Sequence, residues 1–162
     1  MTHAPPGYDC PFCGIANTLP SPAQESAVVL VDANVFALVP THHYAGIQGN
    51  CLVIPRAHYE NVLDIPDALG VDVFRATRRL ATAMRSAFGC DGISTRQHNG
   101  PAGNQDVWHY HLHVFPRYRT TDCTQGRKPA TRPRRASRWR RVCGPRCRDG
   151  AVVASITRHR RV

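Results

Sequence analysis

Three histidines, His109, His111 and His113, stand at every second position in the segment HYHLHVFPR (109–117). The β-branched and aromatic residues of this segment predict a strand, in which alternate side chains share one face. The histidines would then form a column spaced about 6–7 Å apart, while the apolar residues between them face a core. Because a neutral imidazole can bind a metal or attack an electrophile, the column predicts metal binding, nucleophilic chemistry, or both.

A second group of reactive side chains lies near the N-terminus, in Cys10-Pro-Phe-Cys13. Two thiolates at this spacing can hold one zinc ion, with two further ligands from elsewhere. His58 is a candidate third ligand and a histidine of the column is a candidate fourth. A redox dithiol is the alternative, although no thioredoxin-like βαβ pattern surrounds the pair.

Length and composition set the class of protein. A chain of 162 residues is long enough for one domain with a core. It has no apolar run of about 18 residues, and its N-terminus lacks the basic and apolar regions of a signal peptide. A cytoplasmic protein without a membrane partner is therefore expected. Seven cysteines in that compartment favour free thiols or metal ligands over disulfides.

The net charge of +10 is unevenly distributed along the chain. Residues 1–116 hold six Lys+Arg and nine Asp+Glu, whereas residues 117–162 hold fifteen and two. We expect residues 119–162 to form a disordered, Arg-rich tail that could bind nucleic acid. The same composition equally fits the product of a reading-frame shift in a GC-rich gene.

The rest of the chain predicts the elements that position these side chains. Residues 28–39 are typical of two strands joined by an Asp-Ala-Asn turn, and residues 50–55 and 92–98 of two further strands. Between them, apolar spacing predicts a long helix capped by Asp64 and ended at Gly89. With the histidine strand, this order predicts an α+β fold with an antiparallel sheet of about five strands and one long helix.

Four motifs together resemble the histidine triad (HIT) superfamily. H-x-H-x-H followed by two apolar residues is its signature, and LVIPRAH (52–58) is similar to its upstream segment. Asn99 and Gln105 resemble its phosphate loop, and CPFC resembles the N-terminal pair of zinc-containing bacterial members. The resemblance covers about residues 8–118, which we interpret as a HIT-like catalytic domain.

The resemblance implies a homodimer that hydrolyses or transfers nucleotides at the α-phosphorus. His111, the middle histidine, would be the nucleophile and form a covalent nucleotidyl-histidine, while His113 would contact the phosphate and assist the leaving group. Asn99 and Gln105 would position phosphate oxygens. The substrates implied are dinucleoside polyphosphates or nucleoside phosphoramidates.

The resemblance also implies a structural zinc ion held by Cys10, Cys13, His58 and His109. Two other functions stay open at this point. One is a non-catalytic nucleotide-binding or sensor protein on the same fold. The other is an enzyme that removes adenylate from nucleic acid and binds it through the basic tail.

Three positions depart from the family pattern. Asn50 replaces a common histidine, and no acid stands near Val39, where many members have an aspartate for the ribose. Asp106 stands where Ser or Thr is usual. Because a carboxylate beside a phosphate is unfavourable unless it pairs with an imidazolium, Asp106 either orients His113 or faces solvent.

Overall fold

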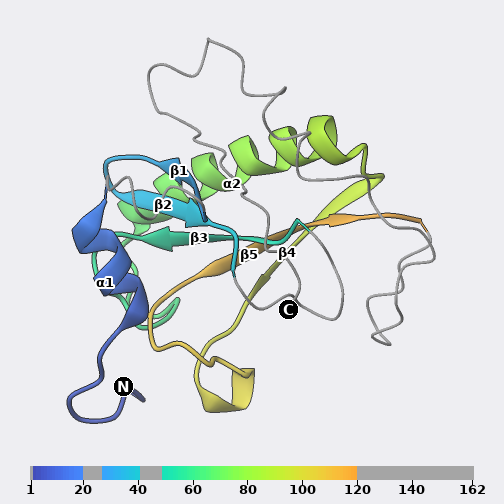
Figure 1. The fold of residues 1–162 in the computed structure, drawn as a ribbon. Helices are drawn as coiled ribbons and strands as arrows, with labels where there is room; N and C mark the ends of the chain where they lie inside the picture. Colours follow the sequence, from blue (N-terminus) through green and yellow to red (C-terminus); the bar gives the residue numbers. More distant parts are fainter. Residues whose placement is uncertain (1, 20–26, 41–48, 120–162) are drawn as a thin grey trace, which may run out of the picture.

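The computed structural model describes residues 2–19, 27–40 and 49–119 (Figure 1). The basic segment 120–162, predicted to be disordered, lies outside these residues. The elements in chain order are α1 (Pro11–Thr18), β1 (Val28–Val31), β2 (Val35–Leu38), β3 (Cys51–Pro55), α2 (Asp67–Phe88), β4 (Gly92–Gln97), the short 3-10 helix η2 (Pro101–Gly103) and β5 (Leu112–Arg117).

The strands form one five-stranded sheet in the order β1-β2-β3-β5-β4, and every neighbouring pair is antiparallel. The α+β class, the five strands and the long helix predicted from the sequence are therefore confirmed. β5, which carries His113, lies between β3 and β4, so it is held by hydrogen bonds on both sides.

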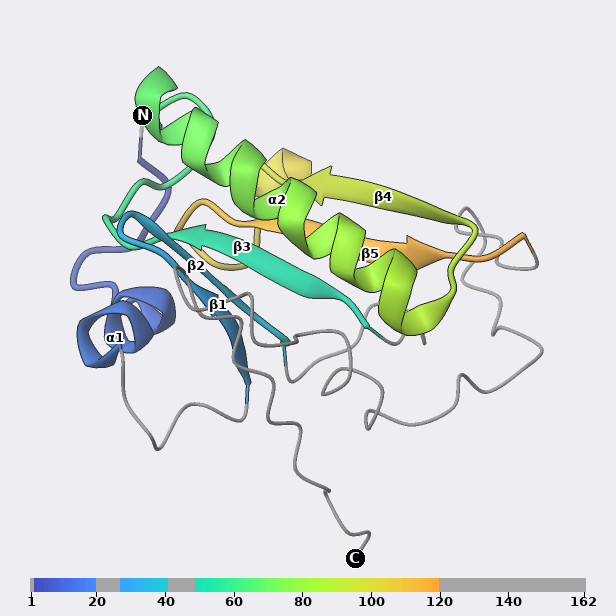
Figure 2. The ribbon, with the colours of Figure 1, turned by 90° about the horizontal axis from the view of Figure 1, so that it is seen from above.

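The long helix α2 lies along one face of the sheet (Figures 1 and 2). Its buried residues recur at helical spacing: Val73, Ala76, Leu80, Met84 and Ala87. They pack against Tyr110, Leu112 and Val114, the apolar residues that alternate with the three histidines. The predicted division of this segment into an apolar face and a histidine face is thus confirmed.

The other face of the sheet packs against α1, which the sequence analysis did not predict. Phe12 and Ala16 of α1 form a second core with Phe36, Leu52 and Ile54 of the sheet. Pro11 at the first helical position is a known start signal, since its missing N–H has no partner there in any helix. This helix brings Cys10 and Cys13 to the histidine face.

The prediction that Asp64 caps the long helix is wrong. The helix begins at Asp67, and the carbonyl of Pro66 accepts the first hydrogen bonds, from the N–H groups of Leu69 and Gly70. A residue before proline disfavours the helical conformation, so the helix cannot start further upstream. The predicted end is confirmed, because Gly89 adopts a left-handed φ of 60° and donates to the Arg85 carbonyl.

The histidine strand is also shorter than predicted. β5 begins at Leu112, so His109 and His111 precede it. The N–H groups just upstream bond to loops instead of a strand: His109 donates to the Val107 carbonyl and Tyr110 to the Tyr59 carbonyl. Within the described residues, no helix is long and apolar enough to cross a membrane.

Candidate metal centre and histidine site

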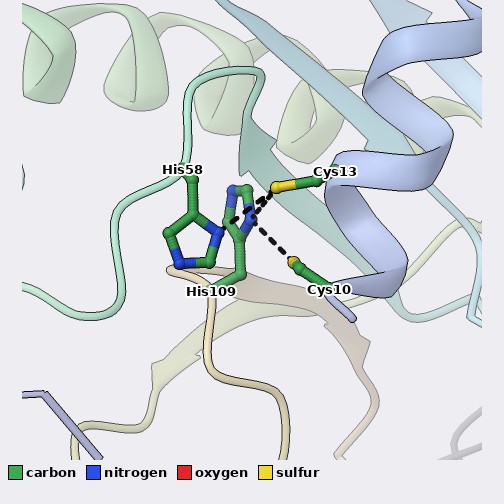
Figure 3. A group of neighbouring side chains, drawn as sticks. All are labelled: Cys10, Cys13, His58 and His109. Atoms are coloured by element: carbon green, nitrogen blue, oxygen red, sulfur yellow. Dashed lines mark hydrogen bonds between the residues drawn. The ribbon is translucent and has the colours of Figure 1, made fainter. Parts of the chain in front are cut away.

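Four potential metal ligands from distant parts of the chain converge (Figure 3). Cys10 and Cys13 come from the start of α1, His58 from the turn after β3, and His109 from the approach to β5. Their ligand atoms all lie within 4.8 Å of one another. His109 Nδ1 lies 3.3 Å from Cys10 Sγ and 3.6 Å from Cys13 Sγ, which is 3.2 Å from His58 Nδ1.

The chemistry of this cluster fits a divalent metal. His109 Nε2–H donates to the Pro55 carbonyl at 3.0 Å, which leaves the Nδ1 lone pair directed at the sulfur atoms. Burial and the neighbouring Cys10 raise the pKa of the Cys13 thiol to about 11, so two thiolates here require a nearby cation. Two cysteines and two histidines are a common ligand set for zinc.

His111 is buried and anchored by its backbone neighbour. Its Nδ1–H donates to the carbonyl oxygen of His109 at 2.8 Å, so Nε2 carries the lone pair. The Phe12 ring contacts the imidazole edge-on, with the ring centroids 5.4 Å apart. Burial lowers the pKa of His111, although the hydrogen bond to His109 and the charge of Asp106 oppose this shift. The imidazole is therefore neutral near pH 7, the form that can act as a nucleophile.

His113 lies beside His111 on β5, with the two ring centroids 5.2 Å apart. Asn50 Nδ2 donates to its Nδ1 at 3.4 Å. Burial, together with the charges of His111, His98 and Arg96, lowers the pKa of His113 to about 4, although Asp106 opposes this shift. His98, which the sequence analysis did not single out, is buried with its ring centroid 6.0 Å from that of His113. In the sequence, His98 directly precedes Asn99, and this position could have marked it as a site residue.

Gln105 is buried and uses its whole amide to shape the loop that precedes the triad. Its Oε1 accepts from the Gly100 N–H at 2.8 Å, and its Nε2 donates to the carbonyls of Glu60 and Val107. The left-handed φ of Gly100 and Asn104 closes the turn around η2. These bonds hold the loop against the segment between β3 and α2 and against the residues just before the histidine segment.

Asn99 is engaged in a similar way. Its Oδ1 accepts from the Val62 N–H and from Gln97 Nε2, both at 2.8 Å, and its Nδ2 donates to Gln97 Oε1. The structure therefore brings Asn99 and Gln105 into one loop next to the triad. Direct contact of either side chain with a phosphate stays a prediction.

Asp106 follows Gln105 and faces the histidine site. Its Oδ1 lies 3.7 Å from Nε2 of His111, and 85% of its side chain is exposed. Of the two sequence-based expectations, orientation of His113 or exposure to solvent, the second is met. The proximity to His111 was not foreseen.

The N-terminal segment also braces this loop, which the sequence analysis missed. His3 donates through its backbone N–H and forms an ion pair through Nδ1 with the buried Glu60 carboxylate, each at 2.8 Å. Burial alone would raise the pKa of Glu60, but hydrogen bonds from His3 and the Ala4 N–H lower it. The His3 ring stacks on the Trp108 ring. The backbone N–H of Trp108 donates to the Tyr8 hydroxyl at 3.2 Å. No spacing in the sequence signals these contacts.

The geometry defines an α+β protein with a Cys/His group that could hold a metal ion, next to an anchored, neutral imidazole. A family model described as HIT domain matches residues 21–120. The chain belongs to this family, as its histidine motif indicated.

Comparison with individual proteins agrees with this assignment. Over 111 residues the chain is 38% identical to the "Protein hit" of Bacillus subtilis, covering 68% of this chain and 72% of that one. It is 36% identical over 70 residues to the adenosine 5′-monophosphoramidase HNT1 of Saccharomyces cerevisiae, covering 43% and 42% of the two chains. The crystal structure of a Zn-bound histidine triad family protein from Mycobacterium smegmatis is 29% identical, covers 83% of this chain and 90% of that one, and superposes with a TM-score of 0.65.

Proposed function

We propose that this protein is a nucleotide hydrolase or nucleotidyl transferase that acts at the α-phosphorus through a covalent intermediate on His111. The substrates are nucleoside phosphoramidates or dinucleoside polyphosphates. The activity of the similar yeast phosphoramidase supports the first of these two classes.

The observation that carries the proposal is the state of His111. Its Nδ1–H is fixed on the His109 carbonyl, and burial keeps the ring neutral, so the Nε2 lone pair is available for attack. In the first step this lone pair forms a bond to the α-phosphorus. The bond to the leaving group breaks, and the leaving group takes its electron pair and, if it is an amine, a proton from solvent water. In the second step a water oxygen bonds to phosphorus, the P–N bond electrons return to Nε2, and the water loses a proton to solvent.

His113 has the complementary role in this proposal. With Asn50 donating to its Nδ1, its proton resides on Nε2, from which it can donate a hydrogen bond to a phosphoryl oxygen or to the leaving group. Asn99 and Gln105 position the phosphate, chiefly by fixing the loop whose amide groups approach it. A typical donor aimed at developing charge contributes about 2.7–4 kcal/mol to the transition state.

We further propose that Cys10, Cys13, His58 and His109 hold zinc as a structural ion. Four protein ligands leave no open position, so the metal would supply rigidity rather than an activated water. The catalytic domain then extends over residues 8–118, because it includes the two cysteines. The cysteines that the structure describes are all unpaired, which supports action in the cytoplasm.

A homodimer is part of the proposal. β4 lies at one edge of the sheet. Beside the turn between β1 and β2, the long helix exposes Val71 and Phe74 by 49% and 67%. Phe74, together with Arg75, Arg78, Arg79 and Asp32, lines a hollow of about 620 Å³ that contains no triad residue. Light scattering of the purified chain tests this, because a monomer mass at micromolar concentration contradicts it.

The two other functions remain as alternatives. A pure nucleotide binder has no use for the anchored lone pair of His111. Nucleic-acid binding would rest on the basic tail, so loss of salt-dependent DNA or RNA affinity after removal of residues 120–162 would support it.

The decisive experiment is intact-protein mass spectrometry after brief incubation with an adenosine phosphoramidate or a dinucleoside polyphosphate, with acid-labile adducts preserved. The wild type is expected to gain the mass of one AMP, and His111→Ala is expected to gain none. Arg85→Ala is the control, since this exposed residue of α2 lies outside the triad, and the variant is expected to form the adduct. AMP release by His111→Ala at the wild-type rate would refute the proposal.

A further inference from the structure

The side chain of Asp106 places a negative charge at the nucleophilic atom of the site. Its Oδ1 is 3.7 Å from Nε2 of His111, the nitrogen that the bond to the His109 carbonyl leaves available. The other neighbours of His111 are the Phe12 ring on one side and the His113 ring on the other. A group bound at Nε2 therefore lies close to this carboxylate.

The charge on the other side of the site has the opposite sign. Arg96 on β4 is the register partner of His113, and side chains that face each other across two strands lie on the same face. The carboxylate of Asp106 therefore acts on both His111 and His113, and at His113 its effect exceeds that of Arg96.

The negative charge of Asp106 acts on the leaving group, which is the part that differs between substrates. Every substrate brings the same α-phosphoryl group to Nε2, so repulsion between that group and Asp106 is common to all of them. The leaving groups differ in charge: a polyphosphate is strongly anionic, whereas an amine can be neutral or can carry an ammonium group. Only the interaction between Asp106 and the leaving group changes the ratio of kcat/KM between two substrates.

We propose that Asp106 selects substrates by the charge of the leaving group, favouring phosphoramidates of cationic amines over dinucleoside polyphosphates and other anionic conjugates. This inference rests on the proposed function and names its preferred substrate class. At a separation of roughly 8 Å and an effective dielectric constant of about 60, one unit of charge changes the rate about threefold.

The test uses three AMP phosphoramidates whose leaving amines share a two-carbon spacer: ethylenediamine, β-alaninamide and β-alanine. They carry a positive, a neutral and a negative end. For the wild type, kcat/KM is expected to fall in that order, by about tenfold between the two charged amines. In Asp106→Asn, which keeps the shape of the side chain, this ratio is expected to fall below about twofold. Asp106→Glu is expected to keep the wild-type order.

Asp64→Asn is the matched control, because it removes the charge of another exposed aspartate outside the site and is expected to keep the tenfold ratio. A wild type without this order overturns the proposal, as does an Asp106→Asn enzyme that keeps it. If Asp106→Asn lost the same factor in rate for all three substrates, Asp106 would be a positioning residue, and the proposal of charge selection would also be overturned.

The failure of the proposed function gives a different result. If the wild type releases no AMP from any of the three, hydrolysis is refuted, and the selection is then measured by binding. Calorimetry on His111→Ala is expected to show the same order of affinities, and the Asp106→Asn, His111→Ala double variant is expected to lose it. Equal affinities in His111→Ala would overturn the role of Asp106.

Discussion

His109 and His111 are two residues apart and have similar burial, yet their surroundings differ at one nitrogen. Both rings have one nitrogen fixed by a backbone carbonyl, Pro55 for His109 and His109 itself for His111. The second nitrogen of His109 faces two sulfur atoms, whereas that of His111 faces an exposed carboxylate. The difference teaches that the role of each imidazole is set by what its second nitrogen meets.

The largest expected effect separates these two histidines by stability. His109→Ala is expected to lose the metal and to lower the free energy of unfolding by about 3–5 kcal/mol, from the missing ligand and the cavity left behind. His111→Ala is expected to keep one zinc ion per chain and to cost less than half as much. Zinc content by atomic absorption and unfolding in urea measure both. Loss of metal from both variants would show that the two roles are not separate.

A smaller effect is expected at the loop that carries Asp106. Gln105→Ala removes the acceptor of the Gly100 N–H and two further hydrogen bonds, so we expect a loss of about 2–3 kcal/mol in unfolding free energy. Hydrogen exchange at the Gly100 amide is expected to accelerate. Ala102→Ser, an exposed change in the same loop, is the control and is expected to be neutral. A neutral Gln105→Ala would mean that water replaces these bonds.

The smallest effect is the pH dependence that His113 contributes. Burial lowers its pKa to about 4, below the value of about 6.5 expected for an unfolded chain, so the unfolded state binds more protons between these values. Stability is therefore expected to fall as pH decreases from 6.5 to 4, with a share of about 1–2 kcal/mol from His113. In thermal melts, the wild type is expected to lose more stability than His113→Gln between pH 7 and pH 4.5. Parallel curves would place His113 in a solvated setting.

The sequence predicted the features that depend on local pattern. Alternation along 109–114 assigned the two faces of that segment, and the spacing from Leu69 to Phe88 assigned the long helix and its end at Gly89. The four ligand residues were named through the family resemblance, and their side chains converge.

The features that were missed depend on contacts between distant residues. The eight-residue helix α1 buries only Phe12 and Ala16, too few for a periodic signal. The start of β5 at Leu112 depends on its pairing with Gln97, where β4 ends, and the direction of the Gln105 amide depends on the Glu60 carbonyl. The proximity of Asp106 to His111 depends on the loop that Gln105 closes, so it cannot be predicted from the residue types alone.

The contact between Cys10 and His109 spans 99 positions in the chain. Closing a loop of that length costs on the order of 4 kcal/mol in chain entropy, so this contact forms only when the sheet has already brought both ends together. During synthesis the two cysteines leave the ribosome early and must stay reduced until the histidine segment follows. We therefore expect the proposed metal site to form late in folding, so that metal uptake by a refolding chain reports the pairing of β3 and β5.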